Sequence, residues 1–174
     1  MTGFDILPGN SQVKWCGSSM IVFDLEWNRG YDKLSLDEIL QIGAVRTNAL
    51  DGAVTDWFNV FIRPAVHRKF DYGAKALPEL RQSIESRTSF PSALEAFRQW
   101  CAGETEFAAW GEGDLDVLKR NCQHWGVACP QMERIYNLQT AFSHAAGGEG
   151  RPVALWRAVD YCGIPDIFTY HDAL

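Results

Sequence analysis

The chain has 174 residues, of which 47% are hydrophobic and 22% charged, a length and composition that suit one globular domain with a buried core. Its formal net charge is −6, which excludes a protein whose whole surface is basic. The five cysteines form no Cys-x-x-Cys pair and no apolar run reaches membrane-spanning length, so we expect a reduced, cytoplasmic compartment and no membrane partner.

The first half of the chain predicts strands. Residues 1–19 show no sustained hydrophobic period and carry proline, glycine, asparagine and serine, so we interpret them as an irregular N-terminal extension or leader. The remainder, 20–174, is interpreted as one domain. It opens with three strand-like runs joined by short connections, which indicates an antiparallel meander. These runs are residues 21–27, 38–47 and 54–63.

The second half alternates between helices and strands. Residues 91–101 have apolar positions at helical spacing, with Ser89 or Phe90 near the helix start and Pro91 in its first turn. Strands first and alternation afterwards predict a mixed α/β fold with one central sheet. The other predicted elements are strands at 106–110 and 134–138 and helices at 113–125 and 153–162.

Two carboxylates mark the end of the first predicted strand. Residues i and i+2 of a strand point to the same face, so Asp24 and Glu26 project together. Adjacent carboxylates repel one another unless a positive charge lies between them, and Mg²⁺ prefers such oxygen ligands. A solvated strand face is the alternative interpretation.

Two further segments carry candidate catalytic residues. Asp114 and Asp116 follow the 106–110 strand at the start of a helix, and open α/β sheets place active sites at this edge. An aspartate that caps the helix explains the same pattern. His171 has the chemistry of a general base, although a histidine at a chain end commonly has no catalytic role.

Taken together, these motifs resemble those of the DEDDh (DnaQ-like) 3′→5′ exonuclease superfamily over roughly residues 20–174. Residues 23–28 (FDLEWN) resemble its first motif, and residues 110–118 (WGEGDLDVL) resemble its second, with Asp114 rather than Asp116 at the position of the acid. Residues 171–174 (HDAL) resemble the opening of its third. The forms DLEWN and WG-x-x-D are most similar to the KapD-like branch, which is related to exoribonucleases.

The resemblance implies a ribonuclease-H-like fold with a central five-stranded mixed sheet flanked by helices. It also implies a metal-dependent exonuclease that releases nucleoside 5′-monophosphates from the 3′ ends of RNA or single-stranded DNA. Asp24, Glu26 and Asp114 would bind two divalent ions, Mg²⁺ or Mn²⁺, and His171 would be the general base. The substrate-binding residues implied are Leu25, Trp27, Asn28 and Trp110, with Trp27 beside the terminal base.

The end of the sequence departs from the family pattern. The family's fourth metal-binding acid falls five residues after the histidine, whereas this sequence ends three residues after His171. Asp172 has the wrong offset. We therefore expect that the exonuclease domain is clipped at its C-terminal helix, and the missing acid leaves an alternative open: an inactive exonuclease-like module that binds nucleic acid or a protein partner.

A second candidate surface for nucleic acid is the most basic stretch of the chain. Arg63, His67, Arg68 and Lys69 lie within seven positions and could contact a phosphate backbone. A solvated loop is the alternative.

Overall fold

The structure is a computed structural model that describes residues 19–32, 34–48, 50–146 and 151–165. A single five-stranded sheet forms the centre of these described ranges. Its order is β3-β2-β1-β4-β5, with antiparallel pairing among the first three strands and parallel pairing of β1 with β4 and of β4 with β5. The strands are β1 (Ser19–Asn28), β2 (Glu38–Asn48), β3 (Val54–Phe61), β4 (Glu106–Ala109) and β5 (Arg134–Asn137). The predicted mixed sheet is confirmed.

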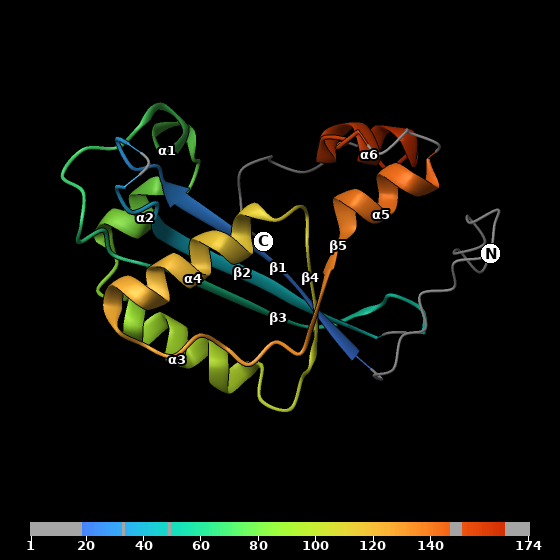
Figure 1. Cartoon of the computed structure of the whole chain (residues 1–174), viewed down its shortest axis with the longest axis horizontal. Helices are drawn as coiled ribbons and strands as arrows, with labels where there is room; N and C mark the ends of the chain where they lie inside the picture. The colour runs from blue at the N-terminus through green and yellow to red at the C-terminus, as the bar shows by residue number, and fades with distance from the viewer. Residues whose placement is uncertain (1–18, 33, 49, 147–150, 166–174) are drawn as a thin grey trace.

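Helices flank this sheet, as predicted. In Figure 1, α1 and α2 group at the upper left and α5 and α6 at the upper right, while α3 and α4 run side by side. The helices are α1 (Tyr72–Ala76), α2 (Leu80–Glu85), α3 (Phe90–Trp100), α4 (Gly113–Trp125), α5 (Leu138–Ala145) and α6 (Leu155–Tyr161). Among the described residues, no helix has the length and apolar character needed to cross a membrane.

The amphipathic helix α3 shows why the sequence folds in this way. Its buried residues are Phe90, Ala93, Leu94 and Phe97, the spacing that places apolar side chains on one helical face. The Ser89 side chain accepts a hydrogen bond from the backbone N–H of Ser92, so Ser89, one of the two predicted starts, is the N-cap. The aromatic ring of Phe97 packs 6.5 Å from that of Phe23 on β1, which joins the helix to the sheet.

Strand β1 alternates between two environments. Ile21, Phe23 and Leu25 are buried in the core, whereas Asp24 and Glu26 are half-buried on the other face. This alternation is the one that the sequence predicts for the two acids.

Some boundaries differ from the predictions. The third strand was expected to reach Arg63 but ends at Phe61, because the N–H of Arg63 donates to the carbonyl of Thr88 and Pro64 follows. The helices α1, α2 and α5 were not predicted, since each has eight residues or fewer and too few turns for a periodic apolar pattern. Strand β1 begins at Ser19, one residue inside the range predicted as a leader.

Candidate active site

Two parallel strands bring the predicted acids to one edge of the sheet. Val22 of β1 pairs with Ala108 of β4, so the end of β1 extends past the end of β4. The chain then turns at Gly111, whose φ of 102° lies in the region that favours glycine, and enters α4 at Gly113. The turn therefore places the first residues of α4 beside the part of β1 that carries Asp24.

Asp114 lies in the first turn of α4 and is buried, with 5% of its surface exposed. Its Oδ1 accepts a hydrogen bond from the backbone N–H of Leu25 at 3.0 Å. The N-cap of the helix is Glu112, so Asp114 does not cap the helix as the alternative interpretation of the sequence supposed. Asp116 is exposed, and the geometry favours Asp114 as the acid of the site.

The acids perturb one another electrostatically. Burial, followed by the negative charges of Asp114 and Glu26, raises the pKa of Asp24 to about 8. Burial also raises the pKa of Asp114, whose carboxyl group forms a hydrogen bond with that of Asp24. The pair therefore holds a proton where a cation would otherwise compensate the charge.

This donor set fits hard divalent cations. Asp24, Glu26 and Asp114 offer only carboxylate oxygens, the ligands that Mg²⁺ and Mn²⁺ prefer. No group of three or more acidic, histidine or cysteine side chains is gathered at metal-binding distance anywhere in the described part of the chain. A metal ion would therefore have to displace the shared proton and draw Glu26 toward the aspartate pair.

A cleft of about 1030 Å³ contains these three acids. It lies between the end of β1 and the helices α1 and α6. Its apolar lining includes Leu77, the C-cap of α1, and Leu155, Trp156 and Val159 of α6. Leu155 and Trp156 are about half exposed. An apolar wall therefore faces the acids, an arrangement that suits a ligand with a charged backbone and flat bases.

Two of the predicted substrate-binding residues have side chains in this cleft. The Trp27 ring is half-buried, and its Cη2 atom lies 3.8 Å from the point where a Cβ on Gly113 would be. The centroid of the Trp110 ring lies 5.9 Å from that of the Phe142 ring, and its buried Nε1–H has no hydrogen-bond partner among the residues that the structure describes. Both residues line the cleft, and their contact with a nucleotide stays a prediction.

The other two predicted substrate-binding residues have structural contacts. The Leu25 side chain is buried in the core, and its backbone N–H is used by Asp114. Asn28 has no exposed surface: its amide donates to the carbonyl of Lys69 at 2.9 Å, and its carbonyl oxygen accepts from the N–H of Asp71 at 2.9 Å. Asn28 thus holds the loop before α1 against the end of β1, and substrate contact by either residue stays a prediction.

The remaining predicted residues lie elsewhere. Arg63, His67, Arg68 and Lys69 do not line the cleft, and His67 bonds instead to the carbonyl of Leu36. His171 and Asp172 lie outside the described residues, as do residues 1–18 of the proposed leader.

Sequence reasoning missed part of the cleft wall. Asp71 lines the cleft and caps α1 by accepting hydrogen bonds from the N–H groups of Gly73 and Ala74. An aspartate before a short helix is a capping signal that the sequence does contain. Arg29, which also lines the cleft, follows the first motif directly, and a single arginine gives no functional signal in the sequence because isolated arginines are common on surfaces.

The sequence and the fold both match known exonucleases. Residues 21–174 match the model of the exonuclease family RNase_T. The chain is 23% identical over 163 residues to the probable 3′-5′ exonuclease KapD of Bacillus subtilis (strain 168), a match that covers 90% of this chain and 78% of that protein.

Solved structures show the same arrangement of strands and helices. The structure of cell-death related nuclease 4 (CRN-4) matches with a TM-score of 0.73 and 19% identity over 90% of this chain, which spans 59% of that longer chain. The nuclease domain of 3′hExo, a DEDDh family member solved with rAMP bound, matches with a TM-score of 0.73 and 14% identity, covering 90% of this chain and 84% of that one. At these identities the structural matches establish the fold.

Proposed function

Because this chain belongs to the exonuclease family RNase_T and is an exonuclease domain of the DEDDh type, we propose that it removes nucleotides one at a time from the 3′ ends of RNA or single-stranded DNA. The observation that carries this proposal is the meeting of Asp24, Glu26 and Asp114 in one cleft of about 1030 Å³, where the N–H of Leu25 fastens Asp114 to the strand that carries the other two acids. The products would be nucleoside 5′-monophosphates.

Three acids would hold the ions that the reaction needs. Asp24, Glu26 and Asp114 fit two Mg²⁺ or Mn²⁺ ions by charge and by donor type. When bound, such ions supply an activated water molecule and stabilise the charge on the leaving oxygen. The hydrogen bond from Leu25 fixes one oxygen of Asp114, and the other oxygen would be the one that binds an ion.

The protein would supply base contacts and a proton acceptor. Trp27 would stack on or beside the terminal base, a contact worth about 1–3 kcal/mol that does not depend on base identity. Trp110 would donate its unpartnered indole N–H to the bound nucleotide. His171 would accept the proton of the attacking water.

The test uses 5′-labelled RNA and DNA oligonucleotides of one sequence, incubated with Mg²⁺, Mn²⁺ or EDTA. We expect a ladder that shortens from the 3′ end and disappears in EDTA. Asp24→Asn should lower the rate at least about a hundredfold, because charge stabilisation by a bound ion is worth several kcal/mol. Asp116→Asn is the matched control, since Asp116 is an exposed acid on the same helix as Asp114. Intact oligonucleotides under every condition would overturn the proposal and favour a binding module.

A further inference from the structure

Most of the charged residues that line the cleft are acidic, so they would repel the phosphates of a nucleic-acid strand. Among its described lining residues are five acids, and Arg29 is the one lysine or arginine. The acids are Asp24, Glu26, Asp71, Asp114 and Asp160. A polyanion that enters this cleft meets repulsion from most of the wall, so a cation that lines it has a strong electrostatic effect.

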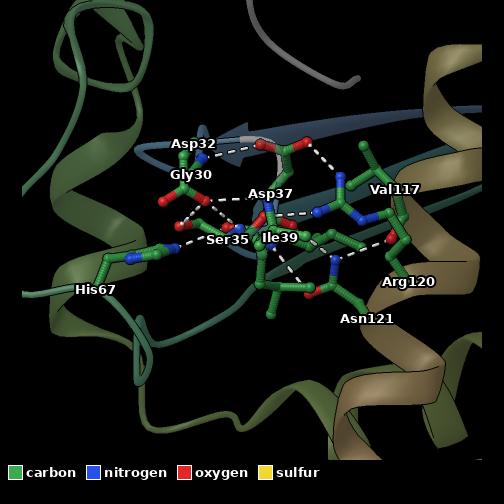
Figure 2. Close-up of polar contacts among 11 residues, drawn as sticks. Gly30, Asp32, Ser35, Asp37, Ile39, His67, Val117, Arg120 and Asn121 are labelled. Carbon is green, nitrogen blue, oxygen red and sulfur yellow. Dashed lines mark hydrogen bonds and ion pairs between the residues drawn. The ribbon is translucent and has the colours of Figure 1, made fainter.

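The backbone at Arg29 is fixed on both sides. The N–H of Arg29 donates to Oδ1 of Asp71 at 3.4 Å, and the side chain of the preceding Asn28 is bonded to the same loop. On the other side, the N–H of Gly30 donates to Oδ1 of Asp37 at 2.8 Å, and Asp37 forms an ion pair with Arg120 at 3.0 Å (Figure 2). The start of the β1–β2 connection is thereby tied to α4, the helix that carries Asp114.

The guanidinium of Arg29, in contrast, is held by no hydrogen bond or ion pair to a described residue. Arg29 is exposed, and within the described ranges its side chain makes no ion pair or hydrogen bond. Its charge acts on the neighbouring Asp71, whose pKa lies below its usual value mainly because Asp71 accepts the N–H bonds of its helix cap. A fixed backbone with a free guanidinium is the arrangement expected of an anion-binding arginine, since its donors can form a bidentate contact with a phosphate.

The position of Arg29 indicates which phosphate it would contact. Arg29 follows Glu26 by three residues, which is roughly 10 Å along an extended chain. The acids would hold the scissile phosphate, so this separation favours a different phosphate as the partner of Arg29.

We propose that Arg29 binds a backbone phosphate other than the scissile one and thereby holds the strand in the cleft. This inference rests on the proposed function, because it takes the cleft to be the path of the nucleic acid. Arg29 would be a binding residue that sets affinity for a polynucleotide, rather than a residue that acts on the reacting atoms.

The first experiment measures binding and cleavage separately. The affinity of the full chain for a 5′-fluorescein single-stranded oligonucleotide is measured in EDTA by anisotropy, for the wild type, Arg29→Gln and Arg29→Lys. Arg87→Gln is the matched control, because Arg87 is exposed and does not line the cleft. We expect Arg29→Gln to weaken binding roughly tenfold to a hundredfold, Arg29→Lys to weaken it less, and Arg87→Gln to leave it unchanged. A plot of log affinity against log salt concentration should become less steep, its slope smaller in magnitude by about 0.7, for Arg29→Gln but not for the other variants.

A second experiment identifies the phosphate. Each phosphate of the oligonucleotide is replaced in turn by a neutral methylphosphonate. At one position other than the scissile one, the replacement should weaken binding by the wild type but not by Arg29→Gln, as in a double-mutant cycle. Equal affinities of the wild type and Arg29→Gln, or a wild type that binds no oligonucleotide, would overturn the inference. Cleavage with Mg²⁺ tests the proposed function independently. If the wild type cleaves the oligonucleotide but Arg29→Gln binds it as tightly as the wild type does, only the role of Arg29 is refuted.

Discussion

The backbone N–H of Leu25 donates to Oδ1 of Asp114 at 3.0 Å, although 89 positions separate the two residues in the sequence. This bond fastens the first turn of α4 to the strand that carries Asp24 and Glu26. One aspartate therefore contributes both to the fold and to the proposed metal site. The two contributions can be separated, because one depends on an acceptor atom and the other on a negative charge.

Comparing Asp114→Asn with Asp114→Leu separates them. Both variants remove the charge, so both should lose activity by at least about a hundredfold. Asparagine keeps an acceptor for the Leu25 N–H, whereas leucine leaves that buried donor unpaired. We expect Asp114→Leu to be less stable than Asp114→Asn by about 1–3 kcal/mol in urea unfolding. Equal stabilities of the two variants would show that the bond contributes nothing to the fold.

The raised pKa of Asp24 predicts how stability depends on pH when metal is absent. The folded-state pKa is about 8 and the ordinary value is 3.8, so between these values the folded protein holds a proton that the unfolded chain releases. The stability of the folded protein is therefore highest, as far as Asp24 determines it, below about pH 4, and this contribution to the free energy of unfolding is lost as the pH rises toward 8. Wild-type stability in EDTA should therefore fall across this interval.

Asp24→Asn removes this dependence, because asparagine does not titrate. In EDTA at pH 8 we expect Asp24→Asn to be more stable than the wild type by roughly 1–3 kcal/mol, and the difference should shrink toward pH 4. Thermal unfolding at several pH values measures it, with Asp116→Asn as the exposed control. A wild type that is the more stable of the two at pH 8 would contradict the assignment.

Adding a divalent metal ion should counteract the loss of stability that the wild type shows as the pH rises. A divalent ion that binds only the folded protein stabilises it by about 2.7 kcal/mol at a concentration one hundred times its dissociation constant. The ion has to displace the proton shared by Asp24 and Asp114, so Mn²⁺ should raise the unfolding temperature more at pH 8 than at pH 6. Asp24→Asn should show little of this increase. The same increase in both proteins would place the bound metal elsewhere.

Much of this arrangement could be predicted from local sequence. The alternation along β1 separates Asp24 and Glu26 from the core residues Phe23 and Leu25, and the amphipathic helix α3 follows from its apolar spacing. Their meeting with Asp114 could not be derived from spacing alone, because it depends on the parallel pairing of β1 with β4. It was expected only through the resemblance to known exonucleases.

The roles of Asn28 and Arg29 could not be predicted at all. The two positions are adjacent in the sequence, yet the side chain of Asn28 is fully buried and holds a loop, while that of Arg29 is exposed and lines the cleft. This difference is set by the loop of residues 69–71, which lies more than 40 positions away. Tertiary contacts of this kind leave no local periodicity in the sequence.

Asn28→Ala should therefore act first on stability. The substitution removes two hydrogen bonds and leaves the carbonyl of Lys69 and the N–H of Asp71 without their partner. We expect a loss of about 2–4 kcal/mol in the free energy of unfolding. A weaker affinity for oligonucleotides should accompany it, because the loop supports the cleft wall at α1. Gln123→Ala, an exposed amide on α4, serves as the control and should change neither quantity.

Gly113 tests whether the position of the Trp27 ring matters for substrate binding. A Cβ at position 113 would lie 3.8 Å from Cη2 of Trp27, which is ordinary van der Waals contact. Gly113→Ala should therefore fold normally, change the free energy of unfolding by less than about 1 kcal/mol because position 113 is the first residue of the helix, and retain activity. Gly113→Leu places further carbon atoms where the indole lies, so Trp27 has to move away from the end of β1.

If Trp27 stacks on the terminal base, Gly113→Leu should raise KM for an oligonucleotide about tenfold, since one stacking contact is worth about 1–3 kcal/mol. The kcat should change much less, because neither residue is one of the three acids. If KM of Gly113→Leu and of Trp27→Ala both equal that of the wild type, the ring is a packing element of the core and the terminal base is held by another part of the cleft.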